Sequence, residues 1–464
     1  MDMGRRDILK WAAASGAAGT GFGLRAQTRS RAMLPGQNEY LIRAGHVLTM
    51  DVSLGDLPAG DVHIRDGRIL AVGEGLIAPD AELIDGREFL VLPGLIETHW
   101  HVWTTMLRSM SGDIAEHGYF PTSRTVGSAY LPSDMYVSSR LALAEAISSG
   151  ITYVHDWCHN VRTPEFAESA LRGLNDSGIR ARFSYGTPTG HPNDLPIDRN
   201  DLRRLSTGWQ EYSGDGRIGL GLAWRGAASA ASIEDAAVAR DLGLPLSVHV
   251  NNYQASAGGI MAIAEAGLLA SDVQLIHAIW SSPEEINAVA ASGASVSLSP
   301  YTELRIGFGF PMTGEYLDAG VPIGLSVDTP ALSGSADMFA IMKLIQNVEN
   351  ARTQNEFRLT ARRVLELATI GGARSMHMDD QVGSLTPGKR ADLIMVDTRH
   401  INLGVVAEPA HALVEAAQPS NVDTVMIDGR ILKRHGQLTA IDVGEVVDEA
   451  RVASVAVRRR ANWW

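Results

Sequence analysis

The feature that most constrains the fold of this chain is a series of eight short apolar runs, each separated from the next by a stretch of helical periodicity. Strands that alternate with helices predict βα units and a parallel sheet. Eight such units close into a barrel. The runs read EFLVLPGLIETHWH, ITYVHDW, IRARFSYG, IGLGLAWRG, LPLSVHVNN, VQLIHAIW, ASVSLSP and VPIGLSVD. The sequence therefore predicts an α/β fold in which residues 93–382 form a (β/α)8 TIM barrel.

One helix between these runs has signals at both ends. Ser282 is a predicted N-cap, Pro283 takes the first helical position and Glu285 completes a capping box. Gly293 is a residue type that commonly ends helices. We therefore expect a helix between Pro283 and Gly293.

A second, smaller domain is predicted from two segments that are distant in the sequence. Residues 38–92 alternate short apolar runs with Asp-Gly turns, which is typical of β-hairpins, and a similar pattern returns in residues 383–445. Because chain ends often lie close together, we expect both segments to complete one small β-sandwich. Residues 446–464 are expected to form a C-terminal helix or tail.

Residues 1–27 have the features of an export signal. Arg5 and Arg6 form a twin arginine, a weakly apolar stretch of small residues follows, and Ala26 precedes a potential cleavage point. The alternative is an amphipathic helix of the mature protein. We predict a twin-arginine signal peptide, recognition by the twin-arginine export machinery, and a periplasmic location.

Composition excludes several classes of partner. The formal net charge of −13 would repel phosphate backbones, so no nucleic-acid partner is expected. No apolar stretch predicts a membrane span. Cys158 is the single cysteine, which excludes an intramolecular disulfide. Barrel enzymes are commonly homo-oligomers, and by that analogy alone a homo-oligomer stays open here.

Polar residues end the eight runs. Catalytic groups of (β/α)8 enzymes come from the C-terminal ends of the barrel strands, so these side chains mark the expected active site. In chain order they are His99 with His101, Asp156, Tyr185, Arg225, His249, His277, Ser299 and Asp328.

His99 and His101 are two residues apart on an extended segment, so both imidazoles point to the same face. His249 and Asp328, which end the fifth and eighth runs, complete a ligand set suited to Zn²⁺ or a neighbouring first-row ion. A single histidine would more simply be a hydrogen-bonded core residue, but four such groups at the correct strand ends favour a metal site. His277 is expected to be a catalytic partner of that site.

Several motifs resemble those of one enzyme family. THWH, SVH, LIHAIWSSPEEI and GLSVDT are similar to the strand-one, strand-five, strand-six and strand-eight motifs of the amidohydrolase superfamily. LPSDMYVSSRLALAEAISSGITYVHD and RSMHMDDQVGSLTPGKRADLIMVD resemble the branch that contains cytosine, guanine and S-adenosylhomocysteine deaminases and triazine hydrolases such as atrazine chlorohydrolase.

The resemblance implies a metal site and a mechanism. The residues that would bind one divalent ion, with Zn²⁺ expected and Fe²⁺, Mn²⁺ or Co²⁺ as alternatives, are His99, His101, His249 and Asp328. His277 and Asp328 would be catalytic, positioning and deprotonating a water whose pKa the ion lowers to about 7. Members of the superfamily with two metals use a carboxylated lysine at the end of strand four. This chain has lysine only at positions 10, 343, 389 and 433, and Arg225 ends strand four, so one metal is expected.

The sequence departs from the deaminases of this branch at one position. They carry a glutamate three residues after the strand-five histidine, where this chain has Asn252. An amide can bind substrate but cannot transfer protons, which puts ordinary deamination in doubt. Glu303, in the segment SPYTELRIGFG, would either replace the missing acid or be a solvated loop carboxylate.

Other residues near the strand ends are candidates for binding substrate. Arg225 would bind a carboxylate or carbonyl of the substrate, or form a salt bridge with Asp156 or a loop acid. Trp103 is expected to line a flat apolar pocket, although some of the neighbouring tryptophans would merely pack on the barrel helices. Of the nine tryptophans, the five that follow the ends of the predicted strands are Trp100, Trp103, Trp157, Trp224 and Trp280. Cys158 beside His159 would be a weak nucleophile, and the loop or core histidines are His117, His155, His159 and His191.

These observations predict an enzyme, a mononuclear metal-dependent hydrolase that attacks an sp² carbon of a small cyclic or aromatic molecule. Hydrolysis of a non-peptide C–N bond, in an amide, carbamate or lactam, fits Asn252 best. Deamination of an N-heterocycle, or displacement of its chloride, is the alternative. A non-catalytic barrel scaffold is the alternative from another class, and the complete ligand set argues against it.

Overall fold

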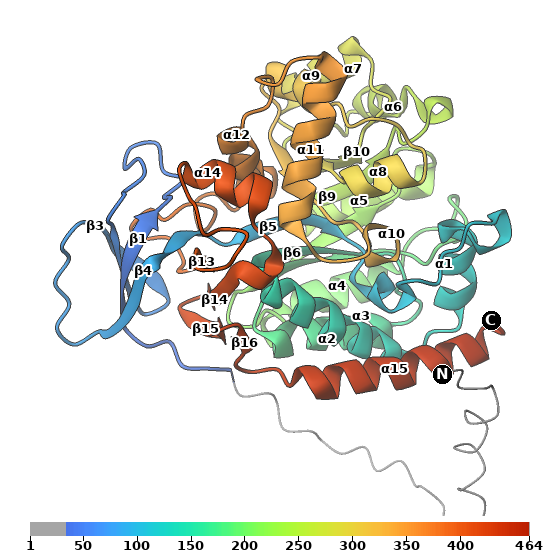
Figure 1. Ribbon diagram of the computed structural model, residues 1–464. Coiled ribbons are helices and arrows are strands. Elements are labelled where there is room, and N and C mark those ends of the chain that lie inside the picture. Colours follow the sequence, from blue (N-terminus) through green and yellow to red (C-terminus); the bar gives the residue numbers. More distant parts are fainter. Residues whose placement is uncertain (1–33, 464) are drawn as a thin grey trace, which may run out of the picture. The chain divides into compact units, whose positions relative to one another are not determined.

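A closed barrel of eight parallel strands is the central element of the computed structural model, which describes residues 34–463 (Figure 1). The predicted signal peptide, residues 1–27, lies outside the described residues. The barrel strands are β5 (Leu95–Trp100), β6 (Ile151–Cys158), β7 (Arg180–Tyr185), β8 (Ile218–Trp224), β9 (Leu246–Val250), β10 (Val273–His277), β11 (Ser295–Leu298) and β12 (Ile323–Leu325). Each predicted run coincides with one of them, and only β6 extends one residue beyond its run, so the predicted barrel is confirmed.

Helices connect the barrel strands and pack around the outside of the barrel (Figure 1). The longer ones are α1 (Tyr119–Ser128), α2 (Pro132–Ser148), α3 (Pro164–Ser177), α4 (Arg199–Thr207), α5 (Ala230–Asp241), α6 (Gly259–Glu265), α7 (Pro283–Ser292) and α11 (Met338–Thr353). Shorter α-helices are α8 (Pro300–Arg305), α9 (Thr313–Asp318), α10 (Pro330–Ser333), α12 (Ala361–Glu366) and α13 (Gly372–Ser375). Within residues 34–463, no helix has the length and apolar content needed to cross a membrane.

Short 3-10 and π-helical turns complete the barrel domain. They are η2 (Val102–Leu107), η3 (Ala115–His117), η4 (Trp209–Glu211), η5 (Gln254–Ser256) and η6 (Leu367–Gly371). The helix predicted from its end signals is confirmed as α7, because the Ser282 side chain accepts a hydrogen bond from the Glu285 amide and Gly293 has a φ of 75°.

The second domain is one mixed sheet of eight strands, built from both ends of the chain. Its N-terminal strands are β1 (Tyr40–Val47), β2 (Asp61–Arg65), β3 (Arg68–Gly73) and β4 (Glu82–Pro93), and its C-terminal strands are β13 (Leu393–Asp397), β14 (Val422–Ile427), β15 (Arg430–Arg434) and β16 (Gln437–Leu438). The long strand β4 pairs in parallel with β1 and antiparallel with β13, and so joins both halves. The strands are therefore hydrogen-bonded into a single sheet, where the sequence predicted the two sheets of a sandwich.

Two other boundaries of the predicted domains differ from the structure. Between β13 and β14 the chain leaves the sheet through α14 (Pro409–His411), η7 (Ala412–Ala416) and η8 (Pro419–Asn421). There it packs on the barrel, and Lys343 of α11 donates a hydrogen bond to the carbonyl of Glu415 at 2.8 Å. The C-terminal helix α15 (Val443–Arg460) begins before residue 446, because the Asp442 side chain caps it.

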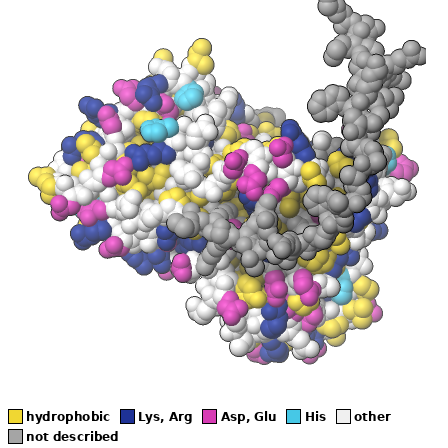
Figure 2. All heavy atoms as spheres, turned by 90° about the horizontal axis from the view of Figure 1, so that it is seen from below, with side chains coloured by type: hydrophobic (Ala, Val, Ile, Leu, Met, Phe, Trp, Pro, Cys, Tyr) yellow, Lys and Arg dark blue, Asp and Glu magenta, His cyan; other side chains and the backbone are white. Residues whose placement is uncertain are grey.

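Helix α15 lies against α2 on one side of the barrel (Figure 1). Two ion pairs connect the helices: Arg140 of α2 pairs with Glu449 of α15, and Asp134 of α2 pairs with Arg460 of α15. Seen from below, the described surface carries Lys and Arg side chains interspersed with Asp and Glu (Figure 2). On this face, acidic and basic side chains are therefore mixed and do not form a patch of one sign.

A buried ion pair connects the barrel to the sheet. Arg180, at the start of β7, donates to Asp392 from Nε at 2.6 Å and from Nη2 at 3.1 Å. Nη2 also lies 3.4 Å from an oxygen of Asp428, and all three side chains are buried. A guanidinium that bonds two carboxylates in this way fixes the orientation of both domains at their contact.

We expect Arg180→Ala to lower the free energy of unfolding by about 3–5 kcal/mol, because it leaves the buried Asp392 carboxylate without its cation, whereas Asp428 keeps its pair with Arg390 at 3.0 Å. Denaturant unfolding followed by circular dichroism measures this loss. Arg87→Ala is the control, since it removes an exposed pair with Asp85 and should leave the unfolding midpoint unchanged. An Arg180 variant as stable as the wild type would contradict the expectation.

Candidate metal centre

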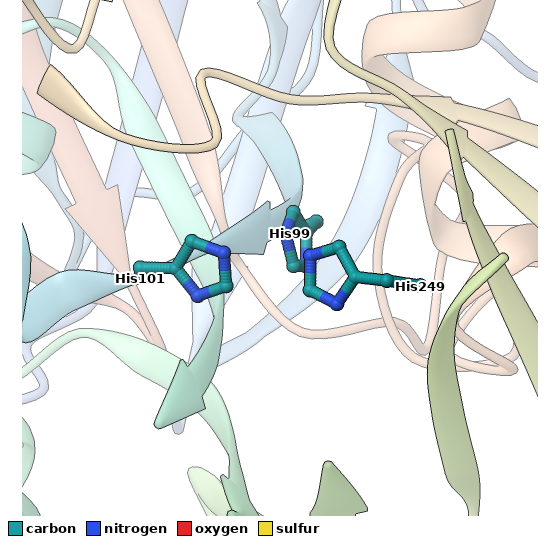
Figure 3. Close-up of side chains that lie close together, drawn as sticks. All are labelled: His99, His101 and His249. Atoms are coloured by element: carbon teal, nitrogen blue, oxygen red, sulfur yellow. The ribbon is translucent and has the colours of Figure 1, made fainter. Parts of the chain in front are cut away.

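Three histidines meet at the C-terminal end of the barrel. His99 is the penultimate residue of β5, His101 follows that strand, and His249 lies near the end of β9. One ring nitrogen from each lies within 4.8 Å of the others. Figure 3 shows the three imidazoles turned toward one another. The period of two along β5 therefore has the predicted effect of placing His99 and His101 on the same face.

Asp328 and His277 lie beside this cluster. Oδ1 of Asp328 lies 3.4 Å from Nε2 of His99 and 3.3 Å from Nε2 of His101. Oδ2 of Asp328 lies 4.0 Å from Nε2 of His277. The structure thus brings together all five residues that the sequence predicted as ligands or catalytic groups.

The backbone at two of these residues is in the left-handed region, with φ of 58° at Asp328 and 67° at His277. Such conformations are unfavourable for residues other than glycine, and they persist where the surrounding structure enforces them. At Asp328 the enforcing contacts are visible, because its amide donates to the carbonyl of His99 at 3.1 Å and its carbonyl accepts from the amide of His101 at 2.8 Å. The strained turn is therefore held directly on the β5 histidines.

The cluster has the properties of a metal site. Both ring nitrogens of His99 and Oδ1 of Asp328 are buried without a hydrogen-bond partner among the described residues. Burial lowers the pKa of His99, His101 and His249 well below the usual value, which favours the neutral rings that can bind a metal. Buried polar atoms normally have partners, and a divalent ion would satisfy these. Three imidazoles and a carboxylate fit Zn²⁺ or another first-row ion.

The sequence missed two groups that orient these residues. Nδ1 of His101 donates to the carbonyl of Trp157 at 2.9 Å, which leaves Nε2 unprotonated and turned to Asp328. Glu97, two residues before His99 on the same face of β5, accepts the amide of His99 at 2.9 Å and that of Val327 at 3.0 Å. The period of two could have indicated Glu97, but the Trp157 carbonyl carries no sequence signal.

Glu303 is a buried partner of His277. It lies in α8, its Oε1 is 3.0 Å from Nδ1 of His277, and it also accepts the amide of Ser299 at 2.7 Å. The side chain is 0% exposed, so the alternative of a solvated loop carboxylate is wrong. Burial raises the pKa of Glu303, an effect that the contact with His277 opposes. Oε2 has no hydrogen-bond partner among the described residues.

Arg225 has structural partners. Its guanidinium donates to the carbonyls of Pro192 at 2.7 Å and Leu195 at 2.5 Å, and it lies 3.2 Å from Asp235 of α5. These contacts favour the salt-bridge alternative, although the partner is a helix residue and neither Asp156 nor a loop acid. A role for Arg225 in binding substrate stays a prediction.

Asn252 follows β9 and is half-buried, and its Oδ1 is buried without a hydrogen-bond partner within residues 34–463. The neighbouring Asn251 differs, because its amide donates to Glu285 at 3.0 Å and its oxygen accepts the amide of Gly259 at 2.9 Å. Asn251 therefore holds the loop after β9, and Asn252 keeps an acceptor available. A substrate contact at Asn252 stays a prediction.

Aromatic rings line the cluster on two sides. The Trp157 ring is 4.3 Å from that of His249 between centroids, and Phe308 is 5.1 Å from His277. Tyr253 packs edge-on against Phe308 at 4.6 Å. The sequence predicted an aromatic wall but did not identify Phe308 or Tyr253, because their loops meet only in three dimensions.

The remaining tryptophans have different surroundings. Trp224 is buried and donates from Nε1 to the carbonyl of Ser232 in α5 at 2.7 Å, so it packs on a helix. Trp100 is also buried, whereas Trp280 is partly exposed and donates to the carbonyl of Phe308 at 2.7 Å. Trp103 is buried in η2, where it contacts Tyr130 with 5.3 Å between ring centroids.

His159 and Cys158 follow Trp157 at the end of β6. The His159 ring lies 4.0 Å from that of His101 between centroids, whereas the sequence assigned it to a loop or core position. The period of two was the missed signal, because Trp157 and His159 share a face. Cys158 is completely buried on the opposite face, and burial raises the pKa of its thiol, which makes it a poor nucleophile.

The chain is similar to known enzymes over nearly its whole length. The 5'-deoxyadenosine deaminase of Methanosarcina acetivorans is 28% identical over 439 residues, which cover 91% of this chain and 99% of that protein. The 5-methylthioadenosine/S-adenosylhomocysteine deaminase of Syntrophobacter fumaroxidans is 27% identical, with coverage of 90% and 98%.

Two solved structures have the same fold. An adenosine deaminase from Xanthomonas campestris with bound zinc superimposes with a TM-score of 0.81 and 22% identity, covering 92% of this chain and 100% of that chain. Atrazine chlorohydrolase from Arthrobacter aurescens, complexed with zinc, gives 0.77 and 23%, covering 89% and 100%.

A sequence model described as the amidohydrolase family matches residues 90–432, which is most of the chain. The relatives of this chain belong to the predicted branch of deaminases and triazine hydrolases. The prediction of a hydrolase acting on C–N bonds other than peptide bonds, and not of a non-catalytic scaffold, is therefore confirmed. This chain belongs to the amidohydrolase family.

Proposed function

We propose that this protein uses one divalent ion, Zn²⁺ in the native enzyme, to hydrolyse a C–N bond at an sp² carbon of a small cyclic or aromatic molecule. The observation that carries the proposal is the buried cluster at the barrel mouth, where both ring nitrogens of His99 and Oδ1 of Asp328 lack a hydrogen-bond partner among the described residues. The proposed ligands are His99, His101, His249 and Asp328. When bound, the ion supplies water that ionises near neutral pH and a positive charge beside the reacting carbon.

His277 is the proposed proton carrier. Its Nε2 faces Asp328 across 4.0 Å, and its Nδ1 contacts Glu303 at 3.0 Å. The Glu303 carboxylate fixes the ring orientation and stabilises the imidazolium. Asp328 and His277 can therefore accept the proton of the attacking water, and Nε2 of His277 can return it to the departing nitrogen.

The bond proposed first is that of a cyclic amide, carbamate or lactam. Hydrolysis of these groups needs one proton for the departing nitrogen, which His277 supplies. Deamination of an aminoheterocycle also needs a proton on a ring nitrogen, and Asn252 cannot provide it. The names of the relatives favour deamination as the second candidate. Glu303 would then be the remaining acid, acting through His277.

Product analysis by mass spectrometry tests the function. Zinc-loaded protein is incubated with cyclic amides, carbamates, N-acyl compounds, aminopurine nucleosides, aminopyrimidines and triazines. Addition of water with ring opening or fragment release supports the first candidate, and replacement of an amino group by hydroxyl supports the second.

We expect His99→Ala to lose the bound ion and at least about 1,000-fold in turnover, because it removes one ligand of the ion that activates water. Metal analysis by plasma mass spectrometry and the same product assay measure both effects. His411→Ala, at an exposed position at the end of α14, is the matched control and should retain both. Full activity in the His99 variant would overturn the site.

We expect Glu303→Gln to lower kcat about 10- to 100-fold with a smaller change in KM, because an amide keeps the contact with His277 but not the charge. The acid limb of the pH–rate profile should move to lower pH, since a neutral amide stabilises the imidazolium form less than a carboxylate does. A fall in kcat with an unchanged profile would mean that Glu303 only supports the packing of α8.

We also propose export by the twin-arginine route to the periplasm, supported by Arg5, Arg6 and the small-residue stretch that follows. Replacing both arginines by lysine should leave the protein in the cytoplasmic fraction, because the export machinery reads the arginine pair. Cell fractionation with immunoblotting measures this. Arg29→Lys, beyond the predicted cleavage point, is the control, and equal export of the two variants would contradict the proposal.

A further inference from the structure

His159 lies in the candidate site without belonging to the proposed ligand set. Its ring is 4.0 Å from His101 and 5.6 Å from Trp157 between centroids, and it is half-buried. The groups of side chains that could hold a metal do not include it. It is therefore a polar ring beside the metal cluster whose role the proposed chemistry does not explain.

The position of this ring is fixed through the backbone of β6. The amide of His159 donates to the carbonyl of Trp157 at 3.1 Å, and the same carbonyl accepts Nδ1 of His101 at 2.9 Å. One oxygen atom thus contacts both histidines, the ring of His101 and the backbone of His159. A group held in this way contacts a ligand with little loss of conformational freedom.

Trp103 determines which nitrogen of His159 carries the proton. The indole nitrogen is a donor only, and it lies 3.4 Å from Nδ1 of His159, so Nδ1 accepts and Nε2 bears the hydrogen. Trp103 is itself tightly packed, because a Cβ added at Gly127 would come within 2.7 Å of its ring. Within residues 34–463, no protein group accepts a hydrogen bond from Nε2.

We propose that His159 is a substrate-binding residue whose Nε2–H donates a hydrogen bond to an acceptor atom of the substrate, a carbonyl oxygen or a ring nitrogen. The proposal rests on the proposed function, since the substrate must reach the metal cluster to meet this donor. Trp103, predicted to bind substrate directly, is then the residue that positions His159. The site thus selects ring compounds that carry an acceptor beside the reacting carbon.

The test uses full-length, zinc-loaded protein and the most rapidly hydrolysed compound of the panel. His159→Phe keeps an aromatic ring but removes the donor, and should raise KM about 10- to 100-fold, the effect of one lost hydrogen bond to a polar substrate group. Its kcat should change less than about threefold and its zinc content should not change. His159→Gln retains an N–H donor and should recover most of the loss. His435→Phe, at an exposed site in the sheet domain, is the matched control.

Trp103→Phe provides a separate readout of the proton position. Histidine ¹⁵N spectra of the wild type should show His159 protonated at Nε2, and this preference should weaken in Trp103→Phe. An unchanged KM in His159→Phe, a loss of zinc in that variant, or protonation at Nδ1 in the wild type would each overturn the proposal for His159. Absence of turnover by the zinc-loaded wild type across the whole panel would instead overturn the proposed function.

Discussion

The candidate metal site depends on the closure of the barrel between its last strand and its first. That seam is narrow: the ladder pairs Leu325 of β12 with Glu97 of β5, and one further bridge joins Trp100 to Asp328. The Glu97 carboxylate strengthens it by accepting the amides of His99 and Val327, one from each side. Because His99 and Asp328 belong to these segments, the contact that closes the barrel also sets the distance between two proposed ligands. Glu97 is buried, and burial raises its pKa. Its hydrogen bonds therefore stabilise both the closure of the barrel and the arrangement of the proposed ligands.

Hydrogen bonds to main-chain atoms set the orientation of the remaining groups. The carbonyl of Trp157 fixes His101 and His159, and the main chain of His99 and His101 holds the strained turn at Asp328. Main-chain atoms of barrel strands move little, so side chains bound to them are placed before any ion or substrate arrives. This explains how the site can accommodate the buried ring of His99, whose two nitrogens have no hydrogen-bond partner within residues 34–463.

The sequence predicted those parts of the structure that repeat with a simple period. Alternating strands and helices indicated the barrel, and the spacing of His99 and His101 indicated a shared face. The position of Glu303 was not predictable in the same way. Glu303 lies in α8, the short helix after β11, whereas its partner His277 ends β10. The partner of Arg225 was missed for a similar reason, since Asp235 lies across a loop on α5. Period and spacing describe neighbours along one strand, whereas these contacts depend on how separate connections fold over the barrel mouth.

The change at position 252 and the burial of Glu303 have a common chemical consequence. An amide at 252 removes a titratable group from the β9 side of the site, while Glu303 places a carboxylate behind His277 on the β11 side. The carboxylate of this site is therefore not a separate group that would contact the substrate directly. It is Glu303, a partner of His277, which in turn faces Asp328. A histidine in this position can receive the proton of the attacking water and release it to a departing nitrogen without a second carboxylate. Reactions that need one proton transfer are compatible with this arrangement, and those that need a second proton on a ring nitrogen must obtain it elsewhere. Which bond of the substrate is hydrolysed thus depends on the side chains at positions 252 and 303, and the fold alone does not determine it.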